Sequence, residues 1–166
     1  MQFRQATLAD LPAATAIIRM AVERMLSLGR KQWDHTYPTD TDIFDDIADG
    51  RGFVLTDRQE TVVAYGAVSH DPEPAYEEIE GDWLSDIPYI VVHRLAVDPT
   101  RRGQGYGRIF LESVETLAAG NGTGSFRIDT NHDNTEMLSI LARLGFEYCG
   151  LIRYGHGERM AYEKLI

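Results

Sequence analysis

Three glycines and two arginines lie close together in one short segment of the chain, with a third arginine directly after it, and together they could bind a phosphate group. The segment reads Val97-Asp98-Pro99-Thr100-Arg101-Arg102-Gly103-Gln104-Gly105-Tyr106-Gly107. A run rich in β-branched residues precedes it and an amphipathic run follows it, so we expect a strand to end there and a helix to begin. Glycines let the backbone approach a ligand and adopt positive φ values without steric cost. The first turn of a helix has unpaired N–H groups and a partial positive charge, which suit a pyrophosphate. Arg101, Arg102 and Arg108 add cations in a chain whose formal net charge is −10.

Two other phosphate-binding loops do not fit this segment. A dinucleotide-binding Rossmann loop has the spacing G-x-G-x-x-G near an N-terminal βαβ unit. Here Gly103, Gly105 and Gly107 are spaced G-x-G-x-G and come late in the chain. A Walker P-loop ends in Gly-Lys-Ser/Thr, which is absent. A tight strand-to-helix turn that binds no ligand remains the alternative interpretation.

The remaining elements indicate an α/β protein in which this loop is preceded by a strand and followed by a helix. Alternating and β-branched runs predict strands over residues 2–5, 53–56, 61–68, 89–97, 125–130, 146–153 and 159–165. Apolar spacing and capping residues predict helices over 8–28, 40–48, from the glycine loop to 120, and 134–144. Residues 71–88 read as a long connection, and connections of this length are often functional. The order of elements favours a sheet covered by helices on both faces.

The loop and a second motif resemble those of a known superfamily. Arg102, Gly105 and Gly107 match the pattern R/Q-x-x-G-x-G/A, and Leu95-Ala96-Val97-Asp98-Pro99 precedes it. Asn134 is followed eleven and twelve positions later by Gly145-Phe146. With the order of elements, these motifs resemble the GNAT-type N-acetyltransferases over nearly the whole chain. The resemblance implies a single domain over 1–166 with an α/β (in some schemes α+β) three-layer fold: a mixed, mostly antiparallel seven-stranded sheet, splayed at the cofactor cleft, with helices on both faces.

The same resemblance implies that acetyl-CoA is the acetyl donor and that no metal takes part. The pantetheine arm would pair with backbone groups of Leu95 and Val97, in the opening between the 89–97 and 125–130 strands. The pyrophosphate would lie on N–H groups from Arg102 to Gly107, and Asn134 would touch the far side of the arm. The expected cofactor-binding residues are Leu95, Ala96, Val97, Arg101, Arg102, Gly103, Gln104, Gly105, Tyr106, Gly107, Arg108 and Asn134. A longer acyl donor is compatible with these residues.

Acetyl transfer needs a neutral amine, a path for its proton, and donors that face the thioester oxygen. In this superfamily the amine usually attacks the thioester directly, and Cys149, with no motif around it, is interpreted as core packing. His93 is the candidate base. It precedes Leu95 by two residues, and strand alternation would place Tyr89, Val91, His93, Leu95 and Val97 on one face. The position resembles that of a histidine in arylalkylamine acetyltransferases. One alternative is that His93 has only a structural role. The base would then be one of the glutamates at 73, 77 and 80, or a water chain.

The general acid departs from the family pattern. The usual tyrosine, seven residues after the motif asparagine, is replaced here by Leu141. Among Tyr106, Tyr148 and Tyr154, we take Tyr154 as the first candidate, because it is near the end of a strand beside the expected cleft. The missing tyrosine keeps open a different class of function, a noncatalytic acyl-CoA-binding or sensor module of the same fold.

The acceptor site is expected opposite the cofactor arm, among residues 30–38, 71–88 and the last hairpin. Aromatic side chains there could line it, namely Trp33, Tyr37, Tyr76 and Trp83, and the acids could attract a cationic amine. The acceptor would be an amine of a small molecule or of a peptide N-terminus.

The acidic charge argues against nucleic-acid binding, no apolar run suggests a membrane span, and a single cysteine excludes an internal disulfide. Cytoplasm is the default location. Neither the acceptor nor the oligomeric state, a homodimer included, follows from the sequence.

Overall fold

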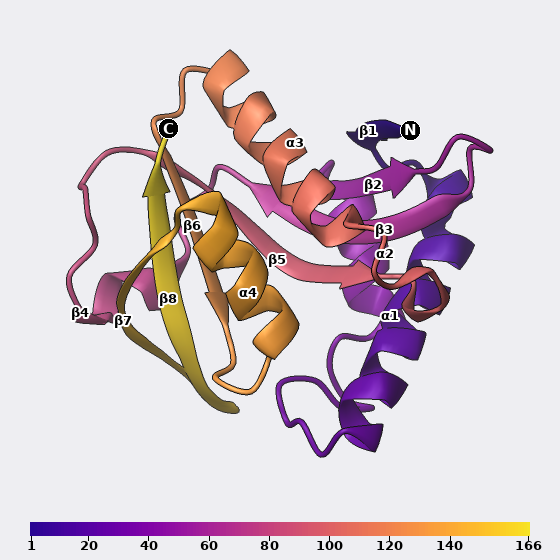
Figure 1. The fold of residues 1–166 in the computed structure, drawn as a ribbon, viewed down its shortest axis with the longest axis horizontal. Helices are drawn as coiled ribbons and strands as arrows, with labels where there is room; N and C mark the ends of the chain where they lie inside the picture. The colour runs from indigo at the N-terminus through magenta and orange to yellow at the C-terminus, as the bar shows by residue number, and fades with distance from the viewer. The chain divides into compact units, whose positions relative to one another are not determined.

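The computed structural model describes the whole chain, from Met1 to Ile166, and the chain divides into two compact units. The first unit contains Met1–Val68 and Arg94–Phe110, and the second contains Ser69–His93 and Leu111–Ile166. The strand β5 (Tyr89–Val97) and the helix α3 (Tyr106–Gly120) have residues in both units (Figure 1). The single domain expected over residues 1–166 stays a prediction.

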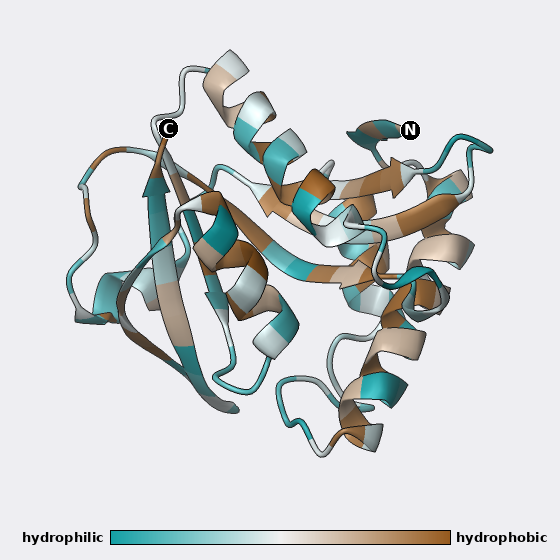
Figure 2. Ribbon diagram, viewed as in Figure 1, coloured by the Kyte–Doolittle hydropathy of each residue, from teal (hydrophilic) through white to brown (hydrophobic).

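The first unit is built on three antiparallel strands, β1 (Gln2–Gln5), β2 (Gly52–Thr56) and β3 (Val62–Ser69). The last two form the predicted hairpin. The helices α1 (Leu11–Ser27) and α2 (Asp40–Ala48) contribute apolar faces that pack with the hydrophobic strands β2 and β3 (Figure 2). The resulting core consists mainly of aliphatic side chains: Ala14, Ile17, Ile18, Val22, Ile43, Ile47, Val54 and Tyr65.

Local hydrogen bonds determine where the helices of this unit begin. At α2 the hydroxyl of Thr39 accepts the N–H of Asp42 at 3.2 Å, and the Asp42 carboxylate accepts the N–H of Thr39 at 2.7 Å. Each side chain thereby pairs an N–H group that would otherwise lack a partner at the helix start. Ahead of α1, the carboxylate of Asp10 accepts the N–H and the hydroxyl of Thr7 at 2.8 and 3.2 Å, and the N–H of Asp10 donates to the Thr7 carbonyl at 2.9 Å.

The predicted helix over residues 8–28 is shorter in the structure. Leu8–Asp10 form a 3₁₀ turn, and the α-helix runs only from Leu11 to Ser27. The two leucines at the ends of the expected apolar stripe, Leu8 and Leu28, are therefore outside the helix, and they are 58% and 47% exposed. Ile17, which the stripe omitted, is buried in the core.

The second unit is a mixed sheet in which β5 pairs in parallel with β6, and the remaining neighbours are antiparallel in the order β6-β8-β7-β4. The bounds are β4 (Glu80–Gly81), β6 (Ser125–Thr130), β7 (Glu147–Tyr154) and β8 (Gly157–Leu165), with α4 at Thr135–Leu144. The predicted count of seven strands is corrected to eight, because β4 forms inside the segment predicted only as a connection. No helix of the protein combines the length and the apolar character needed to cross a membrane.

The connection between β3 and β5 is fixed to the sheet by a buried carboxylate on β8. Glu163 accepts the N–H of Leu84 at 2.5 Å and the hydroxyl groups of Ser85 at 2.7 Å and Ser125 at 2.5 Å. The guanidinium of Arg127 lies 3.2 Å away. Burial alone would raise the pKa of Glu163, but these hydrogen bonds and the arginine charge outweigh burial, so its pKa lies below the usual value. The connection is therefore held in one place and can position the side chains that it carries.

Candidate active site

The glycine loop of the first unit has the backbone shape expected of a phosphate cradle. A 3₁₀ turn, Pro99–Arg101, follows β5, and the carboxylate of Asp98 stabilises it by accepting the N–H and the hydroxyl of Thr100 at 2.8 and 2.7 Å. Gly103 and Gly105 then take φ values of +78° and +77°, and α3 begins at Tyr106. A Cβ atom at either glycine would meet nothing within 4 Å, so the space in front of the loop is open. The N–H groups at a helix start can bind an anion there.

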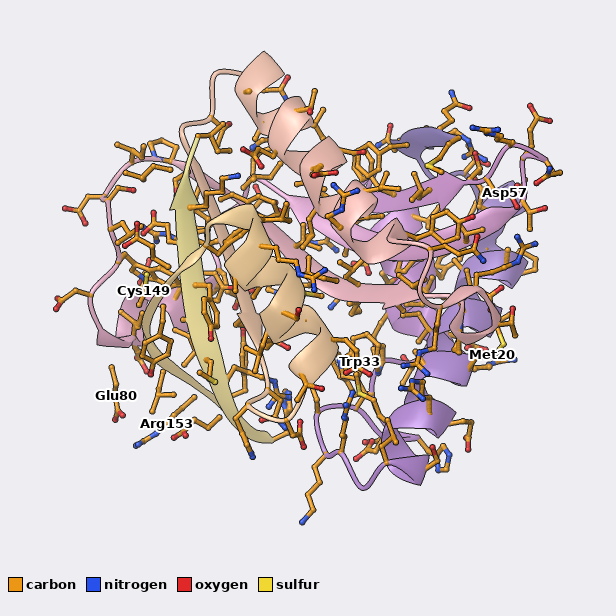
Figure 3. All side chains as sticks on the ribbon, viewed as in Figure 1. Met20, Trp33, Asp57, Glu80, Cys149 and Arg153 are labelled. Carbon is orange, nitrogen blue, oxygen red and sulfur yellow. The ribbon has the colours of Figure 1, made fainter.

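The arginines of the loop differ in what they contact. Arg101 lies 3.2 Å from the buried carboxylate of Asp57, at the turn between β2 and β3 (Figure 3). Burial would raise the pKa of Asp57, but the N–H groups of Thr61 and Gln59 and the charge of Arg101 outweigh it, so the pKa is lowered. Arg101 therefore ties the loop to the hairpin turn, and its predicted role as a cofactor contact stays a prediction. Arg102 and Arg108 are exposed at the surface.

Just before the predicted cofactor segment, β5 contains a residue in a left-handed conformation. Arg94 has a φ of +54°, which is unusual for a residue other than glycine. Its Nε and Nη2 atoms donate to the buried carboxylate of Asp46 at 2.7 and 2.6 Å, and its Nη1 donates to the hydroxyl of Tyr37 at 3.0 Å. Tyr65 also donates to Asp46, at 2.9 Å, and burial followed by the charge of Asp46 raises the pKa of this tyrosine. These contacts hold a conformation that would cost about 1–3 kcal/mol by itself.

This conformation corrects one expectation about β5. Strict alternation would place His93, Leu95 and Val97 on one face, but alternation does not continue through a left-handed residue. Ala96 is buried in the core of the first unit, whereas Leu95 and Val97 are half-buried. Leu95 to Arg108 thus form one continuous stretch of the first unit, which contains every predicted cofactor residue except Asn134.

In the second unit, two polar side chains lie where β5 and β6 stop pairing. The parallel pairing runs from Tyr89–Ser125 to Val91–Arg127 and ends there. His93 and Asp129 each lie two residues beyond the last pair, so strand alternation places them on the same side of their strands as that pair. The end of pairing agrees with the prediction that the sheet opens between these strands.

His93 faces a glutamate from the anchored connection. Its Nε2 atom lies 3.2 Å from Oε2 of Glu73, close enough for an ion pair, yet the geometry is not that of a hydrogen bond, so Nε2 is a buried nitrogen without a hydrogen-bond partner. Glu73 is held in turn, because its N–H donates to the hydroxyl of Tyr89 at 2.8 Å and its Oε1 accepts the N–H of Ala75 at 3.4 Å. A ring nitrogen placed in this way can accept a proton, and the neighbouring carboxylate can stabilise the positive charge that the ring gains.

Asp129 joins the predicted residues Tyr76 and Tyr154. Both hydroxyl groups donate to its Oδ2 atom, at 2.7 Å from Tyr76 and 2.9 Å from Tyr154. Tyr76 is 1% exposed, and burial followed by the charge of Asp129 raises its pKa well above the usual value, so its hydroxyl stays protonated. The ring of Tyr76 lies 6.3 Å from that of His93. Sequence reasoning missed Asp129, because polar and apolar residues alternate along most of the strand Ser125–Thr130 and Asp129 occupies one of its polar positions.

The aromatic residues predicted at the acceptor site have different environments. Trp33 is 6% exposed and belongs to the core of the first unit (Figure 3), so it packs in the interior instead of presenting a free ring. Tyr37 is bound to Arg94. In the second unit the ring of Trp83 lies 5.0 Å from that of Tyr76, and its Nε1–H donates to the Tyr76 carbonyl at 2.9 Å. Their contact with an acceptor stays a prediction.

Three further predicted residues have clear structural roles. Asn134 caps α4: its Oδ1 accepts the N–H of Met137 at 3.4 Å, and its Nδ2 donates to the hydroxyl of Thr130 at 3.1 Å. Leu141, where the family has a tyrosine, is completely buried. Cys149 is also buried, and burial raises the pKa of its thiol, which agrees with its interpretation as core packing.

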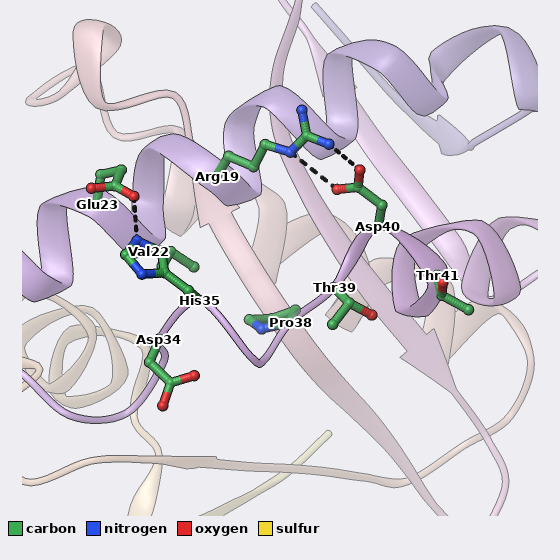
Figure 4. A pocket seen from close by; sticks show the side chains of 9 residues that line it. All are labelled: Arg19, Val22, Glu23, Asp34, His35, Pro38, Thr39, Asp40 and Thr41. Carbon is green, nitrogen blue, oxygen red and sulfur yellow. Dashed lines mark hydrogen bonds and ion pairs between the residues drawn. The ribbon is translucent and has the colours of Figure 1, made fainter.

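A cavity of about 500 Å³ lies in the first unit beside the predicted acceptor segment (Figure 4). It is bordered by α1 and by the residues that lead into α2. Four of its polar side chains form two pairs: Arg19 binds the carboxylate of Asp40, and His35 lies 2.6 Å from Glu23. Asp34, His35 and Pro38 of the predicted acceptor segment line the cavity, but none of the predicted acceptor aromatics does.

Comparison with known proteins gives the family and the fold. The model of the acetyltransferase (GNAT) family matches residues 15–146. A GNAT-family acetyltransferase structure from Streptococcus agalactiae is 33% identical, with a TM-score of 0.90, and the match covers 99% of this chain and 95% of that chain. A phosphinothricin acetyltransferase from Sinorhizobium meliloti, in complex with AcCoA, shares the fold at 18% identity, with a TM-score of 0.72 over 99% of this chain and 88% of that one.

Curated relatives match more weakly. An IAA acetyltransferase from Azospirillum brasilense is 29% identical over 94 residues, which are 57% of this chain and 53% of that protein. The chain spans 33% and 53% of the lengths of the two curated relatives it matches. The fold class and superfamily predicted from the sequence are confirmed by the family model and by the likeness to the Streptococcus agalactiae structure. The chain belongs to the GNAT family of acetyltransferases.

Proposed function

We propose that the protein transfers the acetyl group of acetyl-CoA to the amine of a small molecule or of a peptide N-terminus. The observation that carries the proposal is the glycine loop, in which Gly103 and Gly105 adopt positive φ values and leave open space in front of the start of α3. A backbone of this shape suits a pyrophosphate, and family membership makes acetyl-CoA the natural source of one. The exposed side chains of Arg102 and Arg108 would add positive charge.

His93 is the proposed proton acceptor. In the reaction the amine nitrogen forms a bond to the acetyl carbon, the bond from that carbon to sulfur breaks, and the amine loses a proton. The Nε2 atom of His93 has no hydrogen bond to give up, and the nearby carboxylate of Glu73 can balance the positive charge that the ring gains. Glu73 was one of the alternatives to His93 as the base, and its position now favours a supporting role.

Tyr154 fits the role of general acid less well than the sequence suggested. Its hydroxyl donates to Asp129, so the proton is directed at a carboxylate. CoA is a stable leaving group as a thiolate and needs no protein acid. Tyr154 is better suited to hold Asp129 in place.

The enzyme can be distinguished from a noncatalytic acyl-CoA-binding module by one assay. The protein is mixed with acetyl-CoA and a panel of amines, and the release of free CoA thiol is followed. The mass of the product is then measured by mass spectrometry. We expect thiol release that depends on an amine, with an acetylated product. Calorimetric binding of CoA without thiol release for any amine would instead identify the noncatalytic module.

A further inference from the structure

We propose that Asp129 binds the positively charged amino group of the acceptor, so that the substrates are primary amines that carry an ammonium group in solution. The inference rests on the proposed acetyltransferase function and names the residue that selects the acceptor. Tyr76 and Tyr154 hold the carboxylate in position.

The first argument is the use of the two carboxylate oxygens. Tyr76 and Tyr154 both donate to Oδ2 of Asp129, so neither tyrosine uses Oδ1. The two tyrosines come from different parts of the unit, the 3₁₀ helix Pro74–Glu78 and the strand β7, and they fix the carboxylate from two directions. A carboxylate held in this way has one oxygen left to accept hydrogen bonds from a ligand.

The second argument is charge. Other carboxylates buried within the two units have a cation as partner: Glu163 is paired with Arg127, and Asp46 with Arg94. Asp129 is half-buried, and its hydrogen-bond partners are two neutral hydroxyl groups. Arg127, two residues earlier on β6, is bound to Glu163 and lies between the rings of Trp83 and Tyr89, 4.3 and 4.2 Å from their centres. A partly buried charge without a counter-charge is costly, and an ammonium ligand would supply the missing cation.

The third argument is the surroundings. The ring of Tyr76 packs against those of Trp83, Tyr89 and His93, with centroid distances of 5.0, 6.0 and 6.3 Å. A carboxylate beside aromatic rings is a combination that favours organic cations. Tyr76 contacts both His93 and Asp129, so the proposed ammonium site and the proposed base belong to one cluster of side chains. The nitrogen would bind as a cation and lose one proton to His93 before it attacks. The second proton, released as the nitrogen–carbon bond forms, would leave on the CoA sulfur as a thiol.

The alternative is that Asp129 only anchors the 3₁₀ helix through Tyr76. The two roles differ in what they change. An anchor affects stability and acts on every substrate alike, whereas an ammonium-binding residue affects the Michaelis constant of charged acceptors and leaves that of acetyl-CoA unchanged.

The variant Asp129→Asn tests this, because the amide keeps the shape and an oxygen for the tyrosines while it removes the charge. We expect the Michaelis constant for benzylamine, which is protonated at neutral pH, to rise about 10- to 100-fold, the value of a hydrogen bond to a charged group. The constants for acetyl-CoA and for aniline, which is neutral at the same pH, should change less than about twofold. Tyr76→Phe and Tyr154→Phe should each show a smaller rise for benzylamine. Asp86→Asn, the same change at an exposed position of the connection, serves as the control.

A binding measurement separates this inference from the proposed reaction. Calorimetric titration of benzylammonium, and of methylammonium and 2-phenylethylammonium, into the wild-type protein and Asp129→Asn requires no turnover. Binding that Asp129→Asn weakens supports the ammonium site even if no thiol is ever released. Absence of binding of all three cations to the wild type, equal affinities in both proteins, or an equal loss for benzylamine and aniline would each overturn the proposal.

Discussion

The guanidinium group of Arg94 forms two hydrogen bonds, of 2.7 and 2.6 Å, with the buried carboxylate of Asp46, and it does so from a backbone with a φ of +54°. This pair joins α2 to the strand residue that immediately precedes the predicted cofactor segment. The ion pair therefore determines the direction in which β5 continues towards Leu95, and it couples the stability of the first unit to the shape of its proposed binding segment.

Replacing Arg94 by alanine should destabilise the protein and weaken cofactor binding together. The change leaves Asp46 as a buried charge without its main partner, which costs about 3–5 kcal/mol, and it releases the left-handed conformation. Thermal unfolding and calorimetric titration with CoA measure the two effects. Arg51→Ala is the matched control, since Arg51 lies 3.8 Å from Asp46 and is 39% exposed; it should cost less than about 1 kcal/mol. Unchanged CoA affinity in folded Arg94→Ala would separate the pair from the binding segment.

The glycine loop can be tested with two glycines that share one backbone strain. Gly105 and Gly122 have φ values of +77° and +73°, and neither has an atom within 4 Å of an added Cβ. Valine at either position should therefore cause a similar loss of stability, about 1–3 kcal/mol. Only Gly105→Val should also weaken CoA binding, by more than about tenfold, because the side chain would fill the space proposed for the pyrophosphate. Equal CoA affinity in the two variants would contradict the phosphate cradle.

We expect the two arginines of the loop to have different roles: Arg102 binds the cofactor, and Arg101 stabilises the loop. Arg102→Ala should raise the Michaelis constant for acetyl-CoA more than that for the amine, and the effect should shrink at high salt because exposed charges are screened. Arg101→Ala should mainly lower the melting temperature, since Arg101 pairs with the buried Asp57. If the two variants behave alike in kinetics and in melting, the distinction fails.

His93 should affect turnover and leave cofactor binding intact. His93→Gln retains a hydrogen-bonding side chain of similar size but cannot take up a proton near neutral pH, so turnover should fall about 10²-fold. The acid limb of the pH–rate profile should disappear in the same variant. Glu73→Gln, which removes the charge beside the ring, should give a smaller loss. A structural histidine would instead lower the melting temperature of His93→Gln while turnover per folded molecule stayed at the wild-type level.

Acid sensitivity should arise in part from Asp10. The hydrogen bond from Arg4 is the main cause that lowers the pKa of Asp10, to about 2 from 3.8, despite its burial. Because the folded state has the lower pKa, the stabilisation is present at neutral pH and is lost as the pH falls from about 4 towards 2. Asp10→Asn should be less stable at neutral pH and should lose less stability across that range. Chemical unfolding at several pH values measures this, with Asp40→Asn in an exposed ion pair as the control.

Local patterns were sufficient to predict most elements and the glycine loop. The largely apolar run at residues 61–68 and the glycines at 50 and 52, which end the helix, are local features of the sequence. The hairpin and α2 were therefore predicted within one residue of their observed bounds. Glycine at positions 103 and 105 indicates a backbone with positive φ from the residue type alone. The left-handed Arg94 gave no such signal, since arginine rarely adopts that conformation.

The contacts of the carboxylates of Asp46, Asp129 and Glu163 could not be predicted from the sequence, for a different reason. Asp46 and Arg94 are 48 residues apart, and Tyr76 and Asp129 are 53 residues apart. Nothing in the chain between them encodes their contact, which arises only when the helix or connection packs on the strand. The same holds for Glu163 and Ser85, 78 residues apart, although their pairing fixes the segment that carries Glu73 and Tyr76.

The anchoring of the 71–88 connection at Glu163 divides that segment into two parts with different freedom to evolve. Leu84 and Ser85, at its end, are held by the sheet, and changes there would disturb a buried network. Glu77 and Glu78, in its middle, carry no part of that network and are exposed. Substitutions at these two positions could diversify the preferred amine among related proteins while the sheet kept its structure, so we expect sequence variation between relatives to concentrate there.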